Sequence, residues 1–129
     1  MPAKSRRKGN ISEKRARAFL ESLGFIVQPK APDTRFIHNE IYGCFDGIAY
    51  DPHADSFFCY QVKTKTDRSV NSTIREFREK VLEAFSKVPE RILILFVDEE
   101  SLDLYKSTRE GEFIKLSSNP IDKEGRSIV

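Results

Sequence analysis

Three polar side chains occur where a half-buried pair of strands would be expected to carry apolar ones. Asp46 lies in the segment FDGIAYD, and Gln61 and Lys63 lie in the segment CYQVKTK. Carboxylate and amide oxygens are ligands of the kind that Mg²⁺ prefers, and a lysine close to the ion can position or deprotonate water or stabilise a transition state. These residue types therefore indicate metal-assisted phosphodiester hydrolysis.

The two segments are predicted to form an antiparallel hairpin. Residues 43–50 and 57–63 are rich in aromatic and branched side chains, and the sequence DPHADS between them is typical of a turn. Side chains alternate between the two faces of such a hairpin, and directly opposed residues point to the same face. The register therefore decides which side chains can act together.

Pairing of Tyr50 with Phe57 would place Asp46 opposite Gln61. Lys63 then lies on the same face, and a slip of one residue would separate the three side chains. The other face of the hairpin is expected to pack in the core, and its residues are Phe45, Ala49, Phe58, Tyr60 and Val62.

A helix is expected to precede this hairpin, and a second helix is expected to follow it. The first would begin at Asn10, with Asn10 and Glu13 as a helix cap, and would end near Gly24; its apolar stripe is Ala16, Phe19, Leu20 and Leu23. The second would span about 72–87, with Thr73 and Glu76 as a capping box; its apolar face is Ile74, Phe77, Val81, Leu82 and Phe85.

The remaining segments predict an α/β fold with a central mixed sheet flanked by helices, in the order αβββαβ. FIVQP reads as a short strand, and RILILFV lacks alternation, which is typical of a strand buried on both faces. LDLYK and GEFIKL are weaker strands that would extend the sheet. We expect one domain over residues 10–116, a basic flexible arm over 1–9 and a polar tail over 117–129.

Charge is distributed unevenly along the chain. The formal net charge is +2, but residues 1–17 carry +6 and the remainder carries −4. A basic arm beside an acidic body suits a polyanion as partner, although a solubilising tail would look the same. The longest apolar run, ILILFV, is too short to cross a bilayer, so no membrane association is expected.

The two cysteines are expected to be free thiols. In the register above, Cys44 lies beside Lys63 and is separated from Cys59 by about 13 Å, whereas a disulfide needs Cα atoms within about 7 Å. A cytoplasmic location fits this cysteine usage.

The order of these features resembles the PD-(D/E)xK nuclease superfamily, which has the restriction-endonuclease-like fold. A helix with a glutamate is followed by FDGIAYD, by QVK and by a helix with basic residues, and this is similar to archaeal Holliday-junction resolvases and Mrr-type nucleases over residues 10–97. The resemblance assigns catalytic positions to Asp46, Gln61, Lys63 and Glu13. The chain departs from the pattern at Phe45, where proline is common, and at Gln61, where an acid is common.

The resemblance implies a Mg²⁺-dependent endonuclease for which Mn²⁺ can substitute. Its metal ligands would be Asp46, Gln61, the Val62 backbone carbonyl and Glu13, and its products would carry 5′-phosphate and 3′-hydroxyl ends. Because Gln61 offers a dipole in place of a charge, we expect weaker Mg²⁺ binding than with an acid at this position. DNA is favoured over RNA as substrate, in repair, recombination or restriction, and a homodimer would supply two sites for two strands.

Basic residues around these positions are candidates for phosphate contacts, and no base-reading motif accompanies them. The candidates are Arg6, Arg7, Lys8, Lys14, Arg17, Arg35, His38, Lys65, Arg68, Arg75 and Arg78.

An alternative of another class is a nucleic-acid-binding or assembly subunit that keeps the fold without cleaving. Asp46 and Lys63 would then form an ion pair. Two zinc hypotheses are weaker: the sequence HNE at 38–40 lacks the Pro-Cys-x-x-Cys partner of zinc deaminases, and Cys44, His53 and Cys59 are not spaced as zinc ligands.

Overall fold

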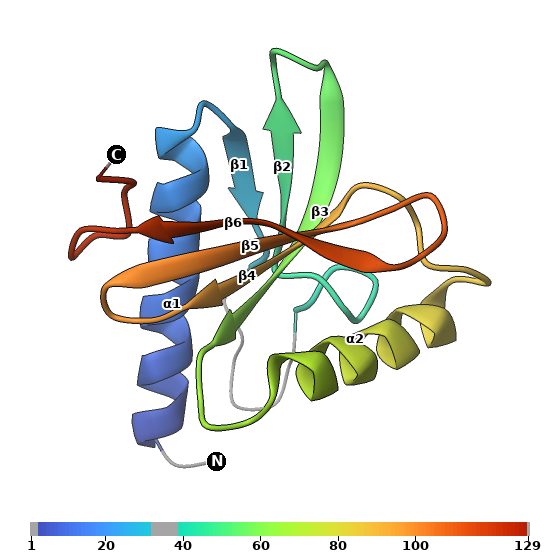
Figure 1. Ribbon diagram of the computed structural model, residues 1–129, viewed down its shortest axis with the longest axis horizontal. Coiled ribbons are helices and arrows are strands. Elements are labelled where there is room, and N and C mark those ends of the chain that lie inside the picture. Colours follow the sequence, from blue (N-terminus) through green and yellow to red (C-terminus); the bar gives the residue numbers. More distant parts are fainter. Residues whose placement is uncertain (1–2, 32–38, 129) are drawn as a thin grey trace.

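The computed structural model describes residues 3–31 and 39–128, with backbone alone for 3–8, and shows a six-stranded mixed sheet with one helix on each face (Figure 1). The elements in chain order are α1 (Ala3–Ser22), β1 (Ile26–Pro29), β2 (Gly47–Asp51), β3 (Ser56–Thr64), α2 (Val70–Ala84), β4 (Ile92–Val97), β5 (Ser101–Ser107) and β6 (Phe113–Pro120). The predicted α/β class and order of elements are confirmed, including the two strands that extend the sheet.

The strands lie side by side in sequence order, from β1 to β6. Neighbouring strands are antiparallel except β3 and β4, which are parallel. A parallel pair needs a crossover connection, and α2 provides it by running across one face of the sheet. β3 and β4 therefore form the centre of the sheet.

The register of the hairpin is the predicted one. Tyr50 pairs with Phe57, and Ile48 pairs with Cys59. The first strand is shorter than expected, because residues 41–45 close a tight turn in which the Ile41 amide donates to the Phe45 carbonyl at 2.8 Å. This turn carries Phe45 to the α2 side of the sheet, so its predicted place on the opposite face was wrong.

Two hydrophobic layers hold the sheet between the helices. The layer under α1 contains Ala16, Phe19, Leu20, Ala49, Tyr60, Val62, Leu93 and Leu95 among others. The layer under α2 contains Cys44, Phe45, Phe77, Val81, Val88, Ile92, Ile94 and Phe96. All six residues of β4 are buried, which confirms a strand covered on both faces. Leu23 and Leu82 were expected in these layers but are 44% and 45% exposed.

Both helices begin earlier than predicted. α1 starts at Ala3, so the basic segment expected to be a flexible arm continues the helix, and Asn10 lies inside it and cannot be its cap. Alanine, arginine and lysine, which dominate residues 3–8, are good helix formers. α2 starts at Val70 with Ser69 as its N-cap, so the predicted capping box at Thr73 was wrong.

Residues after 116 pack against the rest of the domain. β6 extends to Pro120, and Ile121 is 3% exposed in the layer under α1. Gly125 adopts a φ of +103°, and a methyl group there would overlap the backbone of Arg15. Residues 117–127 are therefore packed on the domain, where a polar tail was expected. Within the part of the chain that the structure describes, neither helix has the length and apolar character needed to cross a membrane.

Candidate active site

Asp46 is fixed where three strands meet, immediately before β2. Its amide donates to the Tyr60 carbonyl at 2.8 Å, and its carbonyl accepts from the Lys30 amide at 2.8 Å. Its side-chain Oδ2 accepts from the Val62 amide at 2.8 Å. Because backbone groups on both sides hold the residue, its carboxylate has a defined position although it is only 8% exposed.

Gln61 lies against this carboxylate, as the register predicted. When its amide is oriented to satisfy its neighbours, the nitrogen donates to Asp46 Oδ2 at 3.1 Å and to the Cys44 carbonyl at 2.6 Å. Gln61 is 7% exposed, so both contacts are shielded from water. The amide nitrogen therefore faces the carboxylate, and half a turn of the amide would be needed to present its oxygen there.

Lys63 lies two residues further along β3 and is partly exposed. It is opposite Phe96 of β4, and alternation along the strand puts its side chain on the same face as Gln61. Its positive charge acts on Asp46. The structure therefore places Gln61 against Asp46 and Lys63 on the same face of the sheet as Gln61.

The electrostatic balance at Asp46 is dominated by burial, which raises the pKa of its carboxyl group. The Val62 amide and the charges of Lys30 and Lys63 lower this pKa in part, and the negative charge of Glu40 raises it. The anionic form of Asp46 is thus disfavoured by the fold, which is the condition under which an added cation stabilises a carboxylate most.

Glu13 approaches the site from α1, on the other face of the sheet. Its Oε1 lies 3.8 Å from Lys30 Nζ, and the Lys30 side chain is only 7% exposed. Tyr60 is 2% exposed, and its pKa is raised by burial first and then by the charges of Asp46 and Glu13. Glu13 and Asp46 therefore act on the same phenol from two elements of the fold.

Gly47 is required for this arrangement. A methyl group at Gly47 would overlap the ring and hydroxyl of Tyr60, so the ring packs on the bare backbone beside Asp46. Glycine thus permits an approach that no other residue would allow.

Sequence reasoning missed Lys30, Tyr60 and Glu40. Pro29 pairs with Gly47, so extending the β1–β2 register by one residue would have placed Lys30 opposite Asp46. Tyr60 was assigned to the core because of its type. Glu40 forms a 2.9 Å ion pair with Lys80 of α2. No pattern in the sequence predicts that contact.

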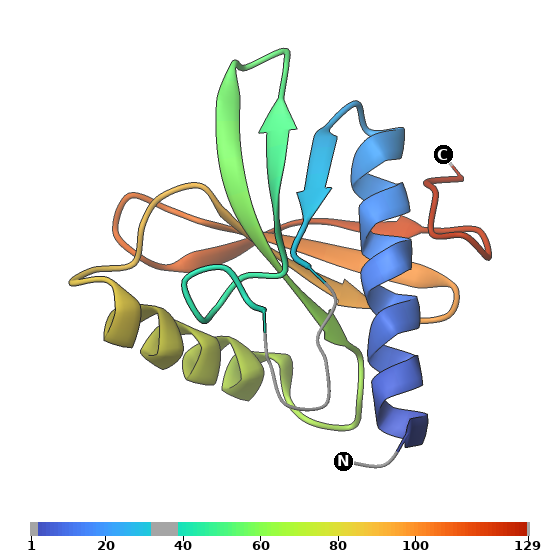
Figure 2. The ribbon, with the colours of Figure 1, turned by 180° about the vertical axis from the view of Figure 1, so that it is seen from behind.

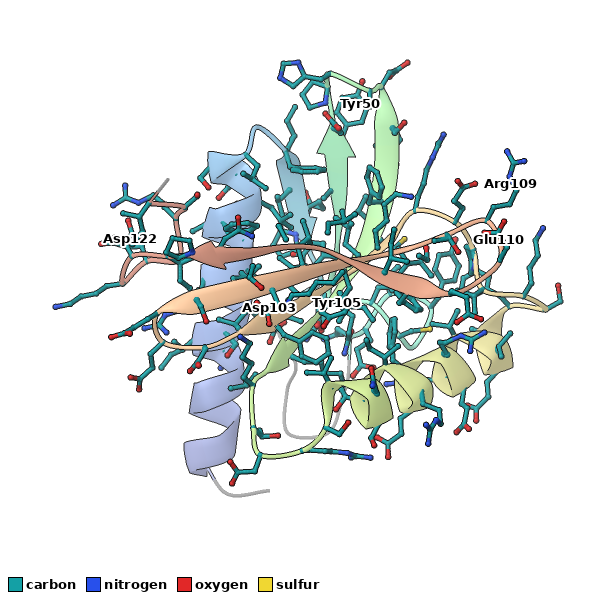
Figure 3. All side chains as sticks on the ribbon, viewed as in Figure 1. Tyr50, Asp103, Tyr105, Arg109, Glu110 and Asp122 are labelled. Atoms are coloured by element: carbon teal, nitrogen blue, oxygen red, sulfur yellow. The ribbon has the colours of Figure 1, made fainter. Side chains whose placement is uncertain are left out.

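The predicted phosphate-binding residues fall into several groups. Lys65 is paired with Asp103 at 3.0 Å, Arg68 with Glu76, and Arg78 Nη2 lies 4.0 Å from Glu112. Arg75 is exposed. Arg6, Arg7 and Lys8 lie on the first turns of α1, and Arg35 and His38 lie outside the described residues. Figure 3 shows Asp103, the partner of Lys65, on β5.

A hollow of about 400 Å³ opens between α1 and the end of β1. Its lining residues are Asn10, Glu13, Lys14, Arg17, Pro29, Lys30 and Tyr60. Three of them are cationic and one is anionic, although Arg17 also pairs with Glu21 at 3.6 Å. The hollow therefore offers a basic surface that includes Lys30 and Tyr60, the two residues whose backbones hydrogen-bond to the backbone of Asp46.

The donor set suits a hard divalent cation. Asp46, Glu13 and the Val62 carbonyl offer oxygen atoms, which are the ligands Mg²⁺ and Mn²⁺ take, and Gln61 would add one only after its amide turns its oxygen towards Asp46. Among residues 3–31 and 39–128, no three His, Cys, Asp or Glu side chains lie close enough together to hold a metal. A metal at Asp46 would therefore depend on amide and backbone oxygens as well as carboxylates.

Comparison with known proteins gives no independent assignment. No family model, no curated protein and no solved structure matches this chain. The functional argument therefore depends on the residues and on the geometry of the site.

Proposed function

We propose that the protein is a metal-dependent endonuclease that hydrolyses phosphodiester bonds in DNA and belongs to the PD-(D/E)xK superfamily, with the restriction-endonuclease-like fold. One observation supports this most strongly. The Asp46 carboxylate is held by the Val62 amide at 2.8 Å beside Gln61, and Lys63 emerges on the same face. A buried carboxylate, an amide and a lysine in this arrangement are difficult to explain by packing alone.

Asp46 would hold Mg²⁺ together with the Val62 carbonyl and with Gln61 once its amide turns its oxygen to the ion, and Glu13, from the other face of the sheet, would contribute through water. When bound, Mg²⁺ supplies neutralisation of the charge that grows on the phosphoryl oxygens and activation of a water molecule. The hydrogen bond from the Val62 amide orients the Asp46 carboxylate, so little reorganisation is needed at the moment of reaction.

Lys63 would act on the substrate side of the site. It is partly exposed, so its ammonium group can reach a phosphoryl oxygen or the attacking water. Lys30 has a different place, because its side chain is buried against Glu13 and acts on Asp46. We assign Lys63 to catalysis and Lys30 to positioning the two carboxylates.

The basic hollow beside the site would bind the sugar-phosphate backbone. Lys14 and Arg17 on α1 line it, and the basic first turns precede these residues on the same helix. Contacts of this kind read shape and phosphates, so the substrate would be selected by structure more than by base sequence.

A substrate panel tests the proposal. Supercoiled plasmid, a flap, a four-way junction and structured RNA are incubated with Mg²⁺, with Mn²⁺ or with EDTA. We expect cleavage that requires the metal and that falls by about 10³-fold in Lys63→Met. Lys123→Met serves as control because Lys123 is exposed at the far end of the chain. Cleavage that survives EDTA would overturn the mechanism.

A non-cleaving nucleic-acid-binding or assembly subunit is the second candidate, and Lys30 favours it. This lysine already places a positive charge beside Glu13 and close to Asp46, where a metal ion would otherwise be needed. Binding of the same nucleic acids without cleavage, in either metal, would select this candidate.

A further inference from the structure

One end of the sheet face that α2 covers is left open. The β2–β3 hairpin rises clear of α2 in both views of the ribbon (Figures 1 and 2). Across this open end Ile26 pairs with Tyr50, and Tyr50 pairs with Phe57, so the three side chains form one row over β1, β2 and β3. Figure 3 shows Tyr50 near the free end of the hairpin.

The row belongs to a larger apolar face, made of Ile26, Tyr42, Ile48, Tyr50 and Phe57. Ile26, Tyr42 and Phe57 are 64%, 69% and 65% exposed, which is high for side chains of this size. The rings of Tyr50 and Phe57 lie 4.7 Å apart. Aromatic pairs of this kind usually pack inside a protein or an interface.

A hollow of about 360 Å³ adjoins the apolar face. It lies between Tyr42, Ile48 and Phe57 on one side and Phe85 and Pro89, at the end of α2, on the other. Tyr42 and Phe85 stand edge to face with centroids 5.3 Å apart, so the two rings pack against each other in the wall of the hollow. The apolar face is therefore shaped to receive a side chain from outside.

The size and composition of the apolar face fit a protein partner. Three large side chains that are about two-thirds exposed present roughly 300–500 Å² of apolar surface. A stable interface buries about 800 Å² on each partner, with an apolar aromatic centre and a polar rim. The apolar face can supply such a centre. A nucleic-acid site would instead need clustered basic residues on the face.

The two ends of the apolar face carry net charges of opposite sign. The hairpin turn carries Asp51 and Asp55, whereas the opposite end carries Lys87 and Arg91 around a single acid, Glu90, for a net charge of +1. A twofold axis through the apolar face would bring the acidic turn of one copy to the basic end of the other, and this would happen twice. We infer that the apolar face joins two copies of this chain in a twofold dimer.

Sedimentation over about 1–100 μM protein tests the dimer. We expect the wild type to sediment at twice the 14.9 kDa of one chain. Phe57→Glu should raise the dimer dissociation constant by about 100-fold or more, because each interface contains the residue twice. Leu116→Glu is the matched control: Leu116 is 50% exposed on β6, outside the apolar face, and its dimer should persist.

A charge variant provides a second measurement. Arg91→Glu should weaken the dimer by about 10-fold, and salt should weaken the wild-type dimer as well. Circular dichroism shows whether each variant is folded. A monomeric wild type at the highest concentration, or a folded Phe57→Glu that stays dimeric, would overturn the inference. Loss of single-stranded DNA binding in Phe57→Glu, with a monomeric wild type, would assign the face to nucleic acid instead. None of these results depends on nuclease activity.

Discussion

Replacing Asp46 with asparagine should stabilise the protein at neutral pH in the absence of metal. The substitution keeps the shape of the side chain and leaves an oxygen to accept from the Val62 amide. It removes a negative charge that is 8% exposed and whose pKa is raised by burial. If Asp46 stabilised the folded protein, its replacement by asparagine would instead lower the stability.

The size of the effect follows from two opposing contributions. Burying a carboxylate costs several kcal/mol even after relaxation. The hydrogen bonds from Val62 and Gln61, at 2.8 and 3.1 Å, stabilise the charged group by about 1.5–3 kcal/mol each, and asparagine retains roughly half of that. The raised pKa indicates that burial outweighs these bonds. We expect a net gain of about 1 kcal/mol, or about 3–5 °C in Tm for a chain of this length.

The gain should depend on pH in a defined direction. The folded-state pKa of Asp46 lies above its ordinary value of 3.8, so the folded protein holds this proton more tightly than the unfolded chain does. The stability that the carboxyl group contributes is fully present below the unfolded pKa and is lost as pH rises through the folded pKa. The advantage of Asp46→Asn should therefore be largest at neutral pH and should shrink towards pH 4.

Thermal melting at several pH values, with and without Mn²⁺, measures both effects. Mn²⁺ should raise the Tm of the wild type and leave that of Asp46→Asn unchanged, because binding stabilises only the form that binds. Asp67→Asn is the control, since Asp67 is exposed in the loop before α2 and should change stability by less than about 0.5 kcal/mol. A lower Tm for Asp46→Asn at pH 7, or a difference independent of pH, would refute the reasoning.

Three further substitutions probe the same site. Lys30→Met should raise the pKa of Asp46 further and reduce stability by about 1 kcal/mol, because the positive charge 3.8 Å from the partly exposed Glu13 is removed. Mn²⁺ titration should show binding about 5–10-fold tighter, and unchanged binding would show that Lys30 does not act on the site. Gln61→Glu should tighten Mn²⁺ binding about 10-fold. Without metal it should lower the free energy of unfolding by about 1–2 kcal/mol at pH 7, because two carboxylates then face each other, and a gain in stability would contradict this. Gly47→Ala should cost about 2–3 kcal/mol in urea unfolding, because its methyl group would overlap Tyr60, and a neutral result would mean that the ring can move away.

The sequence predicted the sheet well because the hairpin has strong local signals. A turn of defined composition between two segments of aromatic and branched residues fixed the pairing of Tyr50 with Phe57, and the position of Gln61 beside Asp46 follows from it. β4 was predictable for a similar reason, since an unbroken apolar run has no polar face to expose.

Features that depend on contacts between distant segments were not predictable in the same way. The turn at 41–45 places Tyr42 at a φ of 55° and Gly43 at a φ of 72°. It moves Phe45 into the hydrophobic layer under α2, although the residue types around it predict a continuous strand. Lys30 reaches the site only because β1 pairs with β2, and a four-residue strand gives a weak register signal. The start of α1 was missed because a basic segment can be helical or flexible with the same composition.

The central claim is that the Asp46 carboxylate drives metal-dependent hydrolysis, and a cleavage assay on matched preparations tests it most directly. The rate with the best substrate of the panel is measured in Mg²⁺ for the wild type and for Asp46→Asn, and Tm is recorded for both. We predict at least about 10³-fold slower cleavage by Asp46→Asn, with an equal or higher Tm. Cleavage by a folded Asp46→Asn at a rate close to that of the wild type would contradict the claim.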